Sequence, residues 1–130
     1  MTDDKEQALV RDFPDIFRDN RKPRTCMLYG CCVGDGWEPI LRRLMGVAAE
    51  ENAGKPLDLQ AYAVQVKEKF GGLRVYWANA TDRLYKETER AERESYLACE
   101  DCGTAEGVTV EGSWVRTLCG PCRQRRRTDR

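Results

Sequence analysis

Two cysteine pairs near the C-terminus constrain the fold of this chain more than any other feature. The pairs are Cys99-Glu-Asp-Cys102 and Cys119-Gly-Pro-Cys122, and the sixteen residues 103–118 separate them. Two C-x-x-C pairs at this distance are typical of a metal site in which each pair supplies two thiolates to one tetrahedral ion. The spacing therefore predicts one structural Zn²⁺ per chain, bound by Cys99, Cys102, Cys119 and Cys122.

Three other interpretations of these cysteines can be weighed from the sequence. Cys119-Gly-Pro-Cys122 matches the active-site tetrapeptide of thioredoxins, but that chemistry needs a βαβ scaffold and only eight residues follow Cys122. A disulfide framework is disfavoured because residues 1–6 are polar and lack the apolar core of a signal peptide. We therefore expect a cytoplasmic protein. Iron in place of zinc stays an alternative.

The chain contains no histidine. This absence removes the commonest general base and every imidazole metal ligand. A site of four thiolates leaves no open coordination position for substrate or activated water. We therefore expect a metal that stabilises the fold of the tail and takes no part in catalysis.

Length and charge limit the remaining classes of protein. The chain has 130 residues, with 22 basic and 22 acidic side chains, so its net charge is zero. A balanced charge argues against a globally basic nucleic-acid binder, and no stretch approaches the ~20 apolar residues of a membrane span. Two local basic clusters stand out as candidate surfaces for a partner protein or nucleic acid: Arg116, Arg123, Arg125, Arg126 and Arg127 in the tail, and Arg18, Arg21, Lys22 and Arg24 near the N-terminus.

The hydrophobic pattern predicts an α+β fold, in which a helix packs on an antiparallel hairpin. Apolar residues at helical spacing predict a helix over 37–51, opened by Asp35 as N-cap with Glu38 in a capping box. Alternation on both sides of Gly71-Gly72 predicts a hairpin over 59–77. Residues 3–12 suit a short helix, and residues 26–33 suit a short buried strand or extended segment.

The C-terminal half predicts a charged helix followed by a small module. Residues 81–98 are dense in charge with a narrow apolar seam, so we expect a connecting helix that projects from the core or bridges to the cysteines. Short strands around Glu111-Gly112-Ser113 would complete a zinc ribbon. The predicted organisation is an α+β domain over 1–80, the connecting helix over 81–98, and a zinc ribbon with a basic tail over 99–130.

Three motifs in this order resemble an uncharacterised group of small phage and prophage proteins. The motifs are Gly34-Asp35-Gly36-Trp37, the segment Val66-Lys67-Glu68-Lys69-Phe70-Gly71-Gly72-Leu73-Arg74, and the four-cysteine ribbon. The resemblance covers roughly residues 13–122. It implies a small protein of a bacterial host's cytoplasm that acts on a host component, such as a defence nuclease or effector complex, in the manner of an anti-CRISPR inhibitor.

Three functional hypotheses follow. The first is a non-enzymatic protein that binds a host protein. The second is a nucleic-acid-binding protein that uses the arginine-rich tail, with Trp114 or Tyr96 stacking on a base. The third is a metal-dependent phosphodiester enzyme, with candidate residues Asp35, Glu38, Glu68, Lys67, Lys69 and Arg74. The enzyme hypothesis is the weakest of the three, because a chain without histidine lacks the commonest general base. We therefore expect that the protein is not an enzyme.

Overall fold

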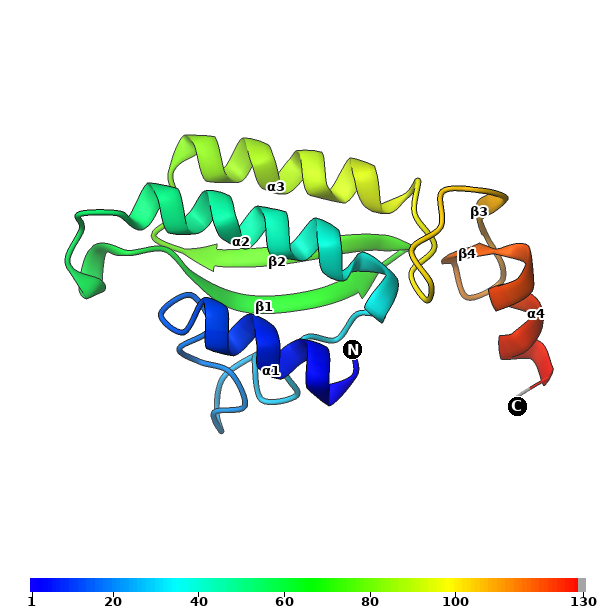
Figure 1. Cartoon of the computed structure of the whole chain (residues 1–130), viewed down its shortest axis with the longest axis horizontal. Helices are drawn as coiled ribbons and strands as arrows, with labels where there is room; N and C mark the ends of the chain where they lie inside the picture. Colours follow the sequence, from blue (N-terminus) through cyan, green and yellow to red (C-terminus); the bar gives the residue numbers. More distant parts are fainter. Residues whose placement is uncertain (129–130) are drawn as a thin grey trace.

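Two helices cover one two-stranded hairpin and form the larger part of the molecule (Figure 1). The computed structural model describes residues 1–128. The hairpin consists of β1 (Tyr62–Lys69) and β2 (Gly72–Ala78), and α2 (Glu38–Asn52) and α3 (Asp82–Ser95) pack beside it. The predicted α+β class is confirmed.

The apolar stripe of α2 is buried as predicted. Trp37, Leu41, Leu44, Met45 and Ala48 are all within 1% of complete burial. The predicted cap of this helix is wrong. Residues Asp35–Trp37 form a 3₁₀ turn (η1), and the α-helix begins only at Glu38 with a proline in its first turn. The Asp35 carboxylate accepts a hydrogen bond from the Thr2 backbone N–H at 2.8 Å, and it does not cap α2.

The hairpin turn uses two residues with positive φ. Phe70 (φ 54°) and Gly71 (φ 83°) join β1 to β2, with Lys69 opposite Gly72 in register. Two central residues with positive φ define the turn whose twist matches that of the strands it joins. The predicted hairpin is confirmed, and its strands run over 62–78, since Leu57–Leu59 form a 3₁₀ turn (η2) before them.

The N-terminal helix is held by one buried carboxylate. Helix α1 (Asp3–Asp12) places Glu6, which is 1% exposed, against the loop that follows. Glu6 accepts hydrogen bonds from the Cys31 backbone N–H at 2.8 Å and from the Arg21 guanidinium at 2.9 Å. Because the Cys31 N–H donates to this carboxylate, it is not free to pair with a neighbouring strand, and the strand predicted over 26–33 does not form. Turns and a single parallel bridge from Cys32 to Lys67 replace it.

The charged helix α3 packs on α2 and β2, so of the two arrangements expected for it, projection from the core is wrong. Thr81 caps it, with its hydroxyl accepting from the Leu84 N–H at 3.2 Å. Leu84 and Ala91 are buried against the larger core, which explains why a narrow apolar seam suffices. Arg43 and Glu94 join α2 to α3 on the solvent side by an ion pair.

The C-terminal module is a small ribbon at one end of the long axis (Figure 1). Strands β3 (Val108–Glu111) and β4 (Arg116–Cys119) pair in antiparallel, and α4 (Gly120–Thr128) follows directly. Its buried residues form a cluster separate from the larger core: Cys99, Leu118, Cys119 and Cys122. The helical form of the tail was not predicted. No helix within residues 1–128 is long and apolar enough to cross a membrane.

Candidate metal centre and adjacent cleft

The four predicted cysteines converge on one point. Their sulfur atoms all lie within 4.8 Å of one another, and the Sγ atoms of Cys102 and Cys119 are 3.7 Å apart. Sulfurs at the corners of a tetrahedron about 2.3 Å from a central metal ion are separated by about 3.8 Å. The arrangement can therefore hold one tetrahedral metal ion. All seven cysteines of the chain are free thiols.

Each pair of cysteines is placed by a tight turn of backbone. In the first pair, the Gly103 N–H donates to the Cys99 carbonyl at 2.8 Å, and the Cys99 N–H donates to the Thr104 carbonyl at 2.9 Å. Gly103 has φ +82°, a conformation that glycine adopts without strain. In the second pair, β4 ends at Cys119 and the first turn of α4 carries Cys122.

The electrostatics of the four thiols suit a bound cation. Burial opposes ionisation of Cys99, but hydrogen bonds from the backbone at Cys119, Cys102 and Asp101 outweigh it and lower the pKa of Cys99 to about 7. Burial and then the neighbouring sulfurs raise the pKa of Cys122 to about 12. One thiolate forms readily and the next is repelled by it, so full deprotonation calls for a positive ion among the four sulfurs.

The glycine-rich motif before α2 lies against the first cysteine turn. A Cβ on Gly36 would lie 2.0 Å from the Cys99 carbonyl oxygen, and one on Gly34 would lie 2.3 Å from that of Glu100. The Gly36 N–H donates to the Glu100 carbonyl at 2.7 Å, and the Trp37 indole donates to the Ala98 carbonyl at 3.0 Å. This motif therefore positions the metal centre, a role that sequence reasoning missed because both partners lie far apart in the chain.

The hairpin turn contacts the ribbon as well. The Thr117 hydroxyl donates to the Gly71 carbonyl at 2.5 Å. Arg116 lies 3.3 Å from the buried carboxylate of Glu100 and 3.5 Å from that of Glu68. The glycine-rich motif before α2 and the turn between β1 and β2 thus both contact the ribbon. The buried polar groups where they meet it are paired.

The residues considered for phosphodiester chemistry make separate contacts in the fold. Glu38 pairs with Arg42 at 2.7 Å, while Asp35 bonds the N-terminal backbone. Glu68 accepts from the Gly71 N–H at 2.7 Å in addition to its pair with Arg116. Arg74 lies 3.3 Å from the carboxylate of Glu92 on α3. Lys67 and Lys69 lie near aromatic rings, those of Tyr76 and Phe70 respectively.

Several tail arginines hold the ribbon together. Arg123, with a side chain only 13% exposed, donates to the carbonyl oxygens of Thr109 and Arg116 at 2.8 and 3.1 Å and so fastens α4 to the β3–β4 hairpin. Arg126 binds Asp101 through two hydrogen bonds of 2.8 and 2.5 Å. The Asp101 carboxylate, stabilised first by Arg126, has a lowered pKa.

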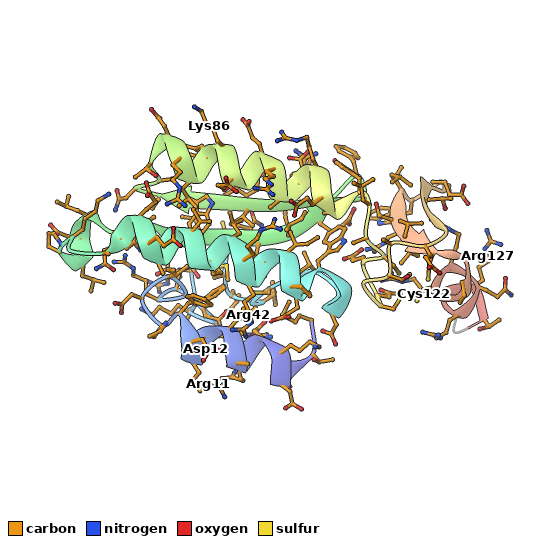
Figure 2. All side chains as sticks on the ribbon, turned by 45° about the horizontal axis from the view of Figure 1, so that its top comes forward. Arg11, Asp12, Arg42, Lys86, Cys122 and Arg127 are labelled. Carbon is orange, nitrogen blue, oxygen red and sulfur yellow. The ribbon has the colours of Figure 1, made fainter. Side chains whose placement is uncertain are left out.

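Arg125 and Arg127 are exposed. Arg125 approaches the Cys122 sulfur at 3.8 Å. Within residues 1–128, Arg127 makes no ion pair and no side-chain hydrogen bond. Figure 2 shows Cys122 and Arg127 together on α4, away from Arg42 and Asp12 beside α2 and α1.

The N-terminal basic cluster is not continuous with the tail. Its loop lies beside α1, whereas α4 is at the far end of the long axis (Figure 1). Arg18 donates to the carbonyl oxygens of Leu57 and Gln60, and Arg21 pairs with Glu6, so both are used in the fold. Lys22 and Arg24 are exposed.

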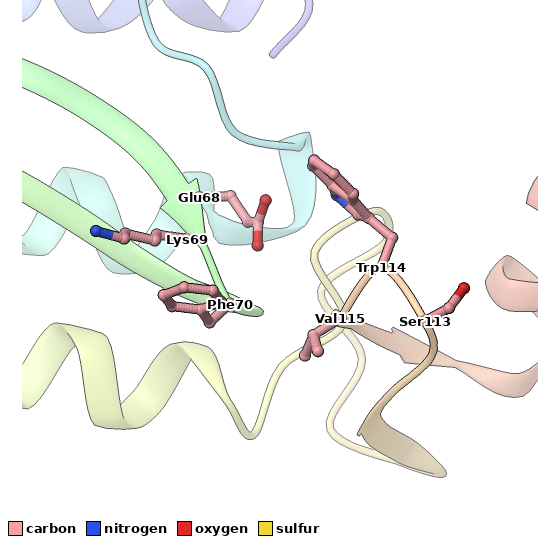
Figure 3. A pocket seen from close by; sticks show the side chains of 6 residues that line it. All are labelled: Glu68, Lys69, Phe70, Ser113, Trp114 and Val115. Atoms are coloured by element: carbon pink, nitrogen blue, oxygen red, sulfur yellow. The ribbon is translucent and has the colours of Figure 1, made fainter.

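A cleft separates the turn of the core hairpin from the turn of the ribbon (Figure 3). Its volume is about 430 Å³, and its lining comprises Glu68, Lys69, Phe70, Ser113, Trp114 and Val115. Two of these side chains are large, apolar and exposed: Trp114 at 72% and Phe70 at 69%. Sequence reasoning had considered Trp114 as a stacking residue, but it missed Phe70, because a turn position alone says nothing of exposure.

A second groove of about 300 Å³ adjoins this cleft and shares Ser113 and Trp114 with it. Four arginines contribute to its lining: Arg116, Arg123, Arg126 and Arg127. Trp114 thus lines both an apolar cleft and an arginine-lined groove.

Comparisons with protein-family models, with curated proteins and with solved structures give no match. The functional argument for this protein therefore depends on its own residues.

Proposed function

We propose that this chain is a small, non-enzymatic binding protein whose four-thiolate centre holds a structural zinc ion and whose target is another protein. The observation that carries the proposal is the exposed pair Phe70 and Trp114 at the rims of one cleft. Exposed aromatic side chains around a concave apolar surface are typical of protein-binding sites. The resemblance to phage proteins supports a host protein as the target, with a defence nuclease or effector complex as the specific hypothesis.

The charge of the ribbon supports a protein target over a nucleic acid. Residues 99–128 contain five arginines and four carboxylates, and four thiolates on a zinc ion add further negative charge. Three of the groove arginines already have internal acidic partners, in Glu100, Glu111 and Asp101. Affinity for nucleic acid comes mainly from several unpaired cations along the phosphate backbone.

Nucleic-acid binding is the second candidate. The observation that favours it is the groove in which Trp114 stands beside Arg116, Arg123, Arg126 and Arg127. An aromatic ring next to guanidinium groups can stack a base and contact its phosphate.

Affinity capture from a bacterial lysate, with and without nuclease treatment, separates the two candidates. We expect a protein partner that survives nuclease and a rise in salt from 50 to 200 mM. A partner lost on nuclease treatment, or an affinity that falls by orders of magnitude over this salt range, would establish the second candidate. Divalent-metal-dependent cleavage of nucleic acid that is lost in Glu68→Gln would instead show an enzyme.

A further inference from the structure

The cleft and the arginine-lined groove form one composite surface. Ser113 and Trp114 line both, so the two depressions meet at this turn of the ribbon. Phe70 and Val115 line only the cleft, and Arg127 lines only the groove. A ligand that occupies both depressions must cross this turn.

The apolar side of the surface suits one large side chain. Figure 3 shows Phe70 on the hairpin side of the cleft and Trp114 and Val115 on the ribbon side, with the amino group of Lys69 directed away from them. The Glu68 carboxylate, which also lines the cleft, is held by the Gly71 N–H and Arg116. Burial of a Leu, Phe or Trp side chain between two aromatic residues would release apolar surface from water on both partners.

The groove side carries one arginine without an internal acidic partner. Arg116, Arg123 and Arg126 pair with carboxylates of the chain itself, whereas Arg127 has no such pair within residues 1–128. A polyphosphate needs several such cations, but one carboxylate needs only one guanidinium, which it can bind through two hydrogen bonds. The charge therefore complements a single acidic side chain.

From this complementarity we propose that the composite surface binds an extended segment of a partner protein in which a large apolar side chain and a carboxylate lie about two residues apart. An extended chain advances roughly 3.4 Å per residue, and side chains two residues apart point to the same side of it, so such a pair can enter two adjoining depressions. The apolar side chain enters the cleft between Phe70 and Trp114, and the carboxylate pairs with Arg127. This inference names the site and partner chemistry for the proposed binding function and rests on it.

The test is fluorescence anisotropy with labelled decapeptides. The probe peptide carries one central Phe with Asp two residues away, and matched peptides replace Phe by Ala or Asp by Asn. We expect the probe to bind, the Asn peptide to bind about tenfold more weakly, and the Ala peptide to lose binding. Equal binding of the Asp and Asn peptides, or no binding of the probe at 1 mM, would overturn the inference.

Matched protein variants identify the surface. Trp114→Ala and Phe70→Asn, the latter chosen because asparagine tolerates the positive φ of this position, should each weaken the probe at least tenfold. Arg127→Gln should weaken the Asp peptide but leave the Asn peptide unchanged. Tyr85→Ala, at an exposed position on α3, should bind like the parent protein. Full binding by Trp114→Ala would contradict the assignment.

Two further outcomes keep this inference distinct from the proposed function. If Trp114→Ala captures the same lysate protein as the parent chain, the composite surface is wrong while the binding function stands. If the parent chain captures no protein but binds the probe as described, the surface stands and the proposed function falls. Displacement of the probe by a single-stranded oligonucleotide at low concentration, or self-association that buries Trp114, would overturn the assignment to a partner peptide.

Discussion

Gly36 and Gly34 lack side chains because the backbone of the first cysteine turn occupies the space that a Cβ would need. Around Gly36 the obstruction is the Cys99 carbonyl and the Gly103 N–H, both backbone atoms that cannot rotate away. The first cysteine turn of the ribbon thus restricts these two positions just before α2 to glycine. The effect is steric and independent of any special φ value at Gly36.

Gly36→Ala should therefore separate the ribbon from the core. We expect a loss of about 3 kcal/mol in the free energy of unfolding, since the methyl group forces backbone atoms apart. Gly46→Ala is the matched control: it lies in α2 with nothing within 4 Å of the added atom and should gain roughly 0.5–1 kcal/mol. Urea unfolding of both variants measures the difference, and equal stability of Gly36→Ala and the parent chain would refute the steric argument.

Glu6 gives the α1 region a dependence on pH. Burial alone would raise the pKa of its carboxyl group, but Arg21 and the Cys31 N–H outweigh burial and hold it below its ordinary value of 4.5. A lowered pKa in the folded state means that the carboxylate stabilises the fold above about pH 4.5, and that this contribution is lost as pH falls through the lowered value.

Replacing Glu6 by Gln should cost about 2 kcal/mol at pH 7, because the charged acceptor of the Arg21 guanidinium and the Cys31 N–H is removed. The gap between variant and parent should narrow in acid, as the pH falls through the lowered pKa and the parent carboxylate becomes protonated. Asp4→Asn, at an exposed position of the same helix, should have little effect at pH 7 or in acid. A gap of constant size across this range would contradict the linkage. Loss of metal in acid affects both proteins alike and cancels in their difference.

At the scale of elements, we expect the ribbon to depend on a metal ion because its own apolar cluster is small. Apart from the cysteines, that cluster contains Leu118, with Val108 packed against it. So few buried apolar atoms cannot offset the conformational entropy of ordering about thirty residues, and the proposed metal ion would supply the missing free energy.

Elemental analysis should therefore find one zinc ion per chain. Cys122→Ser should lose the ion and unfold β3, β4 and α4, while the hairpin and its helices stay folded around their separate core. Cys26→Ser is the control, because Cys26 is exposed and outside the cluster of four sulfurs. Near-ultraviolet circular dichroism and metal content report the two effects. A metal-free protein with a Cys119–Cys122 disulfide that cycles with reductant would show redox chemistry instead.

Patterns confined to one segment were predictable from the sequence. The stripe of α2, the existence of the hairpin and the spacing of the cysteine pairs each specify their structure locally. The hairpin turn lies one residue earlier than the predicted Gly71-Gly72 pair, at Phe70 and Gly71. The strand expected over 26–33 did not form, because apolar residues such as Met27 and Val33 are buried without extended backbone once Glu6 binds the Cys31 N–H. That carboxylate is more than twenty residues away, outside the reach of periodicity.

Arginines show the same limit at the candidate site. A run of positive charge in the sequence indicated an exposed binding surface. In the structure, however, Arg123 donates hydrogen bonds to carbonyl oxygens of the ribbon, and Arg126 pairs with Asp101. Only the fold distinguishes them from Arg127. Likewise, the cleft at Phe70 and Trp114 combines two turns more than forty residues apart, so no local pattern could have specified it.

For the molecule as a whole, the metal centre and the cleft are parts of one arrangement. The ribbon supplies Ser113, Trp114 and Val115 to the cleft, and the core supplies Phe70. The contacts that align the two walls come from Gly36, which meets the first cysteine turn, and from Gly71, which meets Thr117. If the ribbon loses its ion, we expect the cleft to lose the wall that the ribbon supplies and the alignment of that wall with Phe70.

Removal of the metal by a strong chelator should therefore abolish binding of the probe peptide while the core remains folded. The Gly36 N–H donates to the Glu100 carbonyl at 2.7 Å, so its hydrogen exchange should become fast in the metal-free protein. The Trp77 indole, bonded to Thr88 at 2.9 Å within the core, should keep its nuclear magnetic resonance signal. Restoring zinc should restore both slow exchange and binding, since the fold of the ribbon is coupled to the ion. Undiminished peptide binding by metal-free protein would mean that the cleft forms without the metal, and that the ion stabilises only the tail.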